Sequence, residues 1–71
     1  MKDHISYEDF MARVDKYYAQ FKNDWKYGQT YFNVLTSVRG DIADSIRGTI
    51  HDPFHKNEVS KETEKLVKSR W

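Results

Sequence analysis

Two histidines and a carboxylate are the first side chains whose types and spacing could do chemistry. His51 and His55 stand four residues apart with Asp52 between them, and two imidazoles with one carboxylate can bind a divalent metal. Pro53 interrupts the pair, so a regular helical arrangement of both rings is not expected, and His4 is the remaining imidazole. The other interpretation is a loop whose histidines make local hydrogen bonds. We expect this second arrangement, with no metal site and no cofactor.

The remaining sequence offers no catalytic set. Serine, histidine and aspartate all occur, but neither a nucleophile elbow nor a glycine-rich phosphate loop accompanies them. The three glycines are twelve and eight residues apart, a spacing typical of helix punctuation. The carboxylate pairs Asp41/Asp44 and Glu62/Glu64 fit helix caps or solvated helix charges. We therefore predict that the protein is not an enzyme.

Two arginines, Arg39 and Arg47, each precede a glycine in the central stretch of the chain. Both lie where a helix is expected to end, and a cation there suits the helix dipole. One interpretation is that two ion pairs brace the fold, Arg39 with Asp44 and Arg47 with Asp52. The other is that the two guanidinium groups are presented as a fork to an anionic partner.

Aromatic residues surround a lysine just before these arginines. Trp25, Tyr27 and Tyr31 lie close to Lys26 in the sequence, and such rings either stack on bases or anchor protein contacts. Tyr18 is a further aromatic candidate for the surface. We predict that partner contacts are made by Trp25, Lys26, Tyr31, Arg39 and Arg47.

Helical spacing of apolar residues in the first half of the chain indicates the elements that position these side chains. A stripe at intervals of three and four runs from Tyr7 to Phe21 and predicts a helix over residues 7–22, with Ser6 as its N-cap. A second stripe runs from Tyr27 to Val38, and Asp24 can cap that helix. Gly28 falls on the second stripe, where it either allows another helix to approach closely or precedes the start of the helix.

Glycines mark the following boundaries. Gly40 fits the left-handed position after the second helix, and Asp41 fits the next N-cap. A short helix then covers residues 42–47, with Ile42, Ala43 and Ile46 turned inward, and Gly48 ends it.

The last part of the chain reads as a loop followed by a helix. Residues 49–57 form the loop, and Ser60 can cap a helix over Lys61–Trp71 whose Leu66, Val67 and Trp71 face inward. Its basic residues pair with neighbouring glutamates or form a stripe that faces phosphates. No alternation typical of strands occurs, so we predict an all-α fold, a compact bundle of three longer helices and one short helix.

Length and composition limit the classes of protein. The 71 residues suffice for one helical domain over 1–71, and the absence of cysteine excludes disulfides and cysteine-based metal sites. A net charge of +1 argues against nucleic-acid binding by bulk charge. No stretch reads as a signal peptide or a membrane span, so we expect a soluble, cytoplasmic protein with no membrane partner.

The central stretch resembles small uncharacterised accessory proteins of tailed bacteriophages. The resemblance covers about thirty residues, 25–54, through a pattern of the form GQ…FN.L…R.D.A..IRGT..DPF. A proline often stands in that group where this chain has Gly40. The matching positions are Gly28, Gln29, Phe32, Asn33, Leu35, Arg39, Asp41, Ala43, Ile46, Arg47, Gly48, Thr49, Asp52, Pro53 and Phe54.

The resemblance implies a phage source, a location in the host cell cytoplasm and action by binding. We expect a non-catalytic protein that binds a macromolecular partner such as a host or defence protein, either as a monomer or as a homo-oligomer. The alternative is a nucleotide or single-stranded nucleic-acid binder, or sponge, that uses Arg39, Arg47 and aromatic stacking.

Overall fold

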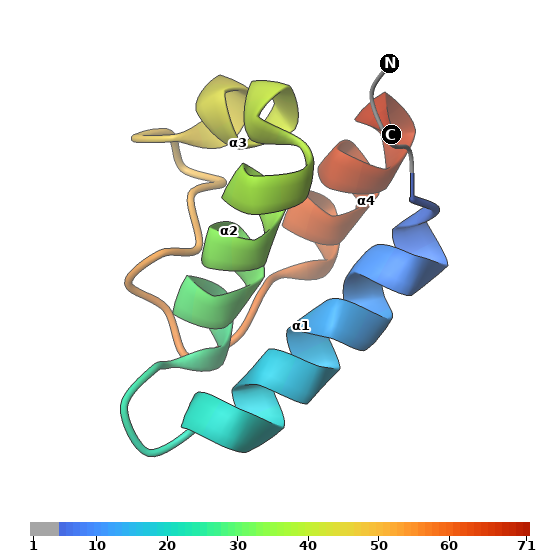
Figure 1. The fold of residues 1–71 in the computed structure, drawn as a ribbon. Coiled ribbons are helices and arrows are strands. Elements are labelled where there is room, and N and C mark those ends of the chain that lie inside the picture. Colours follow the sequence, from blue (N-terminus) through green and yellow to red (C-terminus); the bar gives the residue numbers. More distant parts are fainter. Residues whose placement is uncertain (1–4) are drawn as a thin grey trace.

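Four helices make up the regular structure of the computed structural model, which describes residues 5–71 (Figure 1). They are α1 (Tyr7–Phe21), α2 (Tyr27–Val38), α3 (Gly40–Ile46) and α4 (Lys61–Arg70). No strand occurs among the described residues. The predicted all-α fold of three longer helices and one short helix is confirmed.

Serine caps begin α1 and α4, as predicted. The Ser6 hydroxyl accepts a hydrogen bond from the Asp9 N–H at 3.0 Å, and the Ser60 hydroxyl accepts one from the Thr63 N–H at 3.1 Å. Each bond satisfies a donor that the helix itself leaves free in its first turn. The caps fix where the two outer helices start.

The start of α2 differs from the prediction. Lys26 is its N-cap and makes no side-chain cap bond. Asp24 does not cap the helix, because it stands two residues before the N-cap. The N–H groups of Asp24 and Trp25 both donate back to the Phe21 carbonyl at 2.8 Å and close the end of α1. The Asp24 side chain therefore lies too early in the sequence to accept a hydrogen bond from the first turn of α2.

Gly28 allows a close approach, but of a loop rather than a helix. It is buried in the first turn of α2, and its N–H donates to the Lys56 carbonyl at 3.0 Å. A Cβ atom at this position would overlap the carbonyl oxygens of Pro53 and Lys56. The glycine is thus required by the segment that connects α3 to α4.

The junction between α2 and α3 also departs from the prediction. Gly40 is the first residue of α3 and has no positive φ, and Arg39 rather than Asp41 is the N-cap. Arg39 itself adopts the non-helical conformation that separates the two helices, with φ −143° and ψ 70°, so no left-handed residue is needed. Gly48 does end α3 as predicted, with φ +76°.

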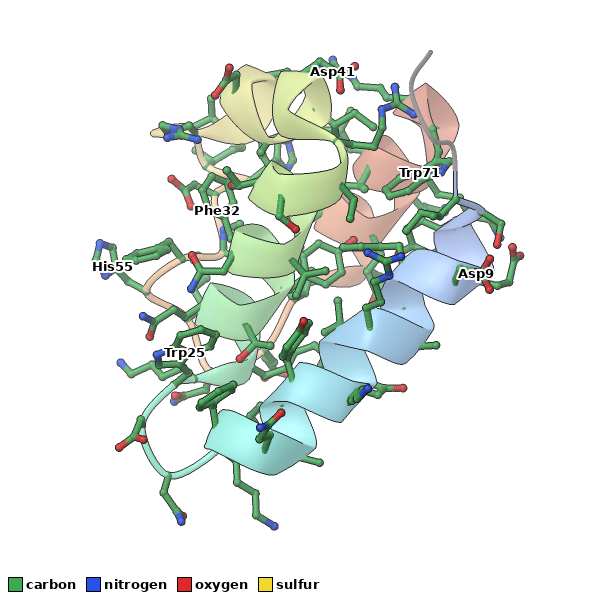
Figure 2. The ribbon with its side chains drawn as sticks, in the orientation of Figure 1. Asp9, Trp25, Phe32, Asp41, His55 and Trp71 are labelled. Atoms are coloured by element: carbon green, nitrogen blue, oxygen red, sulfur yellow. The ribbon has the colours of Figure 1, made fainter. Side chains whose placement is uncertain are left out.

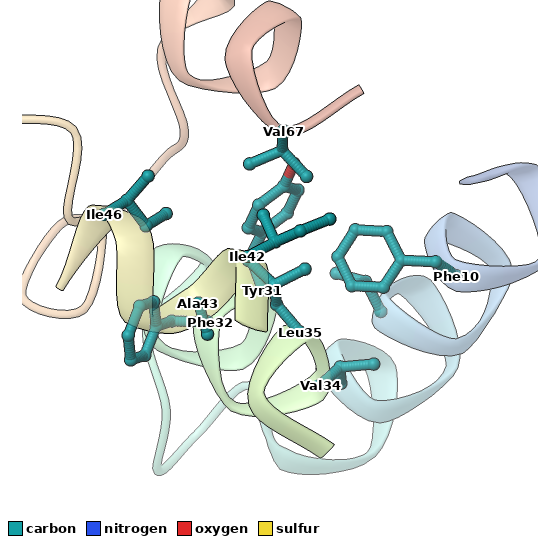
Figure 3. Close-up of a cluster of buried hydrophobic side chains, with 10 residues drawn as sticks. Phe10, Tyr31, Phe32, Val34, Leu35, Ile42, Ala43, Ile46 and Val67 are labelled. Carbon is teal, nitrogen blue, oxygen red and sulfur yellow. The ribbon is translucent and has the colours of Figure 1, made fainter. Parts of the chain in front are cut away.

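The core is filled from all four helices (Figure 3). Its buried side chains include Phe10, Val14, Tyr31, Phe32, Val34, Leu35, Ile42, Ala43, Ile46 and Val67. The three inward residues predicted for α3 are buried, whereas Leu66 and Trp71 are only partly buried. In Figure 3, Val67 of α4 and Val34 of α2 lie on opposite sides of the core, so α4 leaves the Val34 side of the α1–α2 pair uncovered.

The residue after α4 ties the two ends of the described chain together. The Trp71 ring nitrogen donates to the Ile5 carbonyl at 2.7 Å, and its ring packs against Phe10 with 4.9 Å between centroids. Tyr7 meets the same ring edge-on at 5.6 Å.

Among the described residues, no helix is long and apolar enough to cross a bilayer.

Candidate functional site

A row of three aromatic rings lies along the side of the α1–α2 pair that α4 leaves uncovered. Tyr17 and Phe21 are one helical turn apart on α1, and their rings stack with 6.4 Å between centroids and 21° between planes. Trp25, in the turn after α1, stacks on Phe21 at 4.9 Å and 27°. Figure 2 shows Trp25 at the turn end of the helix pair.

These rings form one wall of a groove of about 190 Å³. Asn33, Val34 and Ser37 of α2 form the facing wall. Val34 gives the groove an apolar floor, and Asn33 and Ser37 stand one turn apart on α2. We call this feature the aromatic groove; its apolar centre with polar groups beside it resembles the apolar core and polar rim of protein interfaces.

Tyr17 is the most exposed of these rings. It keeps 41% of its surface accessible, whereas Phe21 and Trp25 are half-buried. The apolar periodicity places Tyr17 and Phe21 in the inward stripe of the first helix, so neither was predicted as a site residue. The signal that could have identified them is the i, i+4 spacing of two aromatics that leads directly to Trp25.

Three of the predicted partner-binding residues lie at the turn end or in α2, and they differ in accessibility. Trp25 lines the aromatic groove, and exposed Lys26 follows it, with its Nζ 3.5 Å from the His55 carbonyl. Tyr31 is fully buried, so its prediction as a surface contact is wrong. Its ring packs edge-on against Phe10 in the core, because it stands on the face of α2 that α1 and α4 both cover. Tyr18 is half-buried against Tyr27 at 5.2 Å.

Arg39 is engaged by the fold. Its Nε and Nη2 each donate to a carboxylate oxygen of Asp41 at 3.0 Å, and its Nη1 donates to the Trp71 carbonyl at 3.1 Å. Nη2 also reaches the Arg70 carbonyl at 3.4 Å, and the guanidinium lies over the Trp71 ring at 5.4 Å. The predicted partner Asp44 is therefore wrong, since Asp41 takes that place. The hydrogen bonds from Arg39 lower the pKa of Asp41 to about 2.

Arg47 also has a different partner from the one predicted. It pairs with Asp44 at 3.1 Å and lies over the Phe32 ring at 5.2 Å. Asp52 instead accepts hydrogen bonds from the N–H groups of Gly48 and Phe54, at 2.7 and 2.9 Å. These bonds hold the loop after α3, so the Asp52 carboxylate is used by its own segment.

The histidine loop shows no metal-binding cluster. Within the described residues no three His, Cys, Asp or Glu side chains converge as a metal site would require. His4 lies outside the described residues. The His51 carbonyl accepts a hydrogen bond from the Thr63 hydroxyl at 3.3 Å, and His55 packs edge-on against Phe54 at 4.9 Å.

Three tyrosines form a second polar feature, on the α4 side of α1: Tyr31 is fully buried, and Tyr7 and Tyr27 are partly buried. The hydroxyls of Tyr7 and Tyr31 lie 3.1 Å apart in a hydrogen bond. Burial raises the pKa of Tyr7 and of Tyr31, and it raises that of Tyr27 to about 12, with Asp15 and Glu64 adding to the effect on Tyr27. All three hydroxyls are therefore neutral at physiological pH and serve the packing of the helices.

The structure thus places the predicted site residues in separate parts of the molecule. Trp25 and Lys26 lie at the turn end of α1 and α2, and Arg39 lies at the far end beside Asp41 and Trp71, both labelled in Figure 2. Arg47 lies after α3. Comparisons of the chain with protein families, with curated proteins and with solved structures find no match.

Proposed function

We propose that this chain is a small phage-type accessory protein that acts by binding a protein partner, a host or defence protein, without catalysis. The observation that carries the proposal is the aromatic groove: three stacked rings, partly exposed, beside an apolar hollow. Tyrosine and tryptophan are the residues that most often dominate the energy of protein interfaces. The resemblance of residues 25–54 to phage accessory proteins supports the class of partner.

The position of the groove supports the same function. In a small domain most large apolar side chains are needed in the core, and Phe10, Phe32 and Tyr31 are buried there in this protein. Tyr17 keeps 41% of its surface exposed at the edge of α1 that borders Asn33, Val34 and Ser37 of α2. Covering this ring and its neighbours by a partner would remove apolar surface from water.

The nucleotide or single-stranded nucleic-acid alternative receives less support. It needs Arg39, Arg47 and stacking aromatics at one place, but Arg39 and Trp25 lie at opposite ends of α2. The guanidinium of Arg39 already serves Asp41 and the end of α4. A phosphate would have to displace those bonds.

Affinity capture with a matched pair of variants tests the proposal. The wild-type chain, Tyr17→Ser and Ile50→Ser are immobilised and exposed to bacterial lysate. Ile50 is the matched control, because it is 86% exposed and lies outside the groove. We expect a protein that the wild type and Ile50→Ser both retain and that Tyr17→Ser loses, while circular dichroism shows all three folded. Equal capture by all three variants, or none by any, would count against the groove as the binding site.

A further inference from the structure

We infer that the aromatic groove takes an acidic segment of a protein partner that inserts one large apolar side chain. This inference rests on the proposed function and adds the chemistry of the partner. The groove of about 190 Å³ between Val34 and the three rings has room for a single anchor of this kind. Its apolar floor favours an aliphatic or aromatic anchor over a polar one.

An excess of positive charge beside the groove favours acidic residues on either side of the anchor. Arg13 precedes Tyr17 by one helical turn, so both stand on the same face of α1, and Lys16 stands one turn from Arg13. Both are exposed, and neither makes an ion pair with another described residue. Lys26 adds a third cation after Trp25, against two carboxylates, Asp24 before it and Asp9 one helical turn before Arg13.

The opposite edge of α1 is different, because its charges have counterparts. Asp15 and Glu64 of α4 both lie near enough to the Tyr27 hydroxyl to raise its pKa, so Asp15 is on the side of α1 nearer α4, and Glu8 stands on the same face two turns earlier. The furrow between α1 and α4 is lined by three lysines of α4, Lys61, Lys65 and Lys68, together with Glu64. Three acids (Glu8, Asp15 and Glu64) thus match the three lysines in number on that side, without an ion pair among these described residues, whereas the groove side keeps an excess of cations.

The ring geometry favours a protein segment over a nucleic-acid strand. Base stacking needs free ring faces. Phe21 is stacked between Tyr17 and Trp25, with interplanar angles of 21° and 27°. The row thus uses ring faces for its own packing. Ring edges and the aliphatic Val34 are well suited to holding an apolar side chain.

A displayed library of random 12-residue peptides, selected on the immobilised full-length chain, tests the inference. Clones are sorted by whether binding is lost with Tyr17→Ser and with Ser37→Lys, which fills the groove from the exposed opposite wall. We expect the groove-dependent clones to carry a large apolar residue flanked by Asp or Glu. Groove-dependent clones that are neutral or basic, or no groove-dependent clones, would overturn the inference.

A matched pair of charge variants measures the contribution of the cations. We expect one selected peptide to bind Arg13→Gln/Lys16→Gln about fivefold or more weakly, since two exposed ion pairs contribute that much together. Lys61→Gln/Lys65→Gln removes the same charge from the α4 face and should change the affinity by less than about twofold. Equal weakening by both double variants contradicts the inference, as does stronger groove binding by a fifteen-nucleotide oligothymidylate. Lysate capture that Tyr17→Ser abolishes would still uphold the proposed function in either case.

Discussion

Gly28 and Gly40 both lie at the start of a helix, but only Gly28 is surrounded so closely that a side chain would not fit. A Cβ atom at Gly28 would overlap backbone carbonyls of Pro53 and Lys56, whereas one at Gly40 would meet nothing within 4 Å. Both residues lie in the first turn of a helix, so their intrinsic helix preferences are the same. The difference between them comes from the loop alone.

Replacing each glycine by alanine separates the two effects. We expect Gly28→Ala to lower the free energy of unfolding by about 1–2 kcal/mol, because overpacking costs more than the gain in helix preference. Gly40→Ala should raise it by about 0.5–1 kcal/mol, since it only restricts the unfolded chain. Urea denaturation of both variants measures the two changes. Equal shifts of the same sign would show that the loop at Lys56 yields freely to a methyl group.

At the scale of the elements, some starts and ends of helices could be predicted from the sequence, whereas the ion-pair partners of Arg39 and Arg47 could not. Ser6, Ser60 and Gly48 act within their own helix turns, so the residue type and the apolar spacing sufficed to place them. The partners of Arg39 depend on its non-helical backbone between α2 and α3, from which its guanidinium reaches the end of α4. Several carboxylates lie within sequence reach of each arginine, and the sequence does not choose among them.

The aromatic site was predicted only in part, for a reason of the same kind. Tyr17 and Tyr31 both belong to apolar stripes, and periodicity assigns each to the inward face of its helix. Tyr31 is enclosed because α1 and α4 both cover its face, whereas Tyr17 stands at the edge of α1 that only α2 borders. Which tyrosine is exposed depends on where the last helix packs, and that is a tertiary fact.

The tyrosines between α1 and α2 also predict how these elements respond to alkaline pH. The pKa of Tyr27 rises from 10.0 to about 12 in the folded chain, chiefly through burial. Its contribution to stability is therefore complete below pH 10 and is lost as the pH rises through about 12, because the unfolded chain releases the proton first. The free energy of unfolding should therefore fall as the pH rises from 10 to about 12.

Tyr27→Phe isolates this contribution, because it removes the hydroxyl and keeps the ring against Tyr18. We expect the variant to match the wild type closely at pH 7 and to lose less unfolding free energy between pH 9 and 11.5. Chemical denaturation at several pH values gives the two slopes, and lysine ionisation affects both proteins equally. Parallel slopes would mean that Tyr27 ionises in the folded chain as it does in the unfolded one.

At the scale of the whole molecule, stability depends on how the last helix is attached. A chain of 71 residues has an unfolding free energy of about 4–10 kcal/mol, so a single large contact is a considerable fraction of it. Trp71 is such a contact, because it joins the end of α4 to Ile5, Tyr7 and Phe10. Arg39 supports it from the α2–α3 junction, through the Trp71 carbonyl and the face of the ring.

Truncating this residue should therefore loosen the whole domain rather than one helix end. We expect Trp71→Ala to lower the free energy of unfolding by about 2–4 kcal/mol, since the half-buried ring leaves a gap against Phe10. Trp71→Phe keeps an aromatic ring and loses the hydrogen bond to Ile5, and should cost about 1 kcal/mol beyond the difference in ring size. Ile50→Ala is the control, because a side chain that is 86% exposed contributes little to folding. Thermal and urea unfolding followed by circular dichroism would reveal the order of the three variants. An unchanged midpoint for Trp71→Ala would mean that α4 is held by Val67 and Thr63 without help from the residue that follows it.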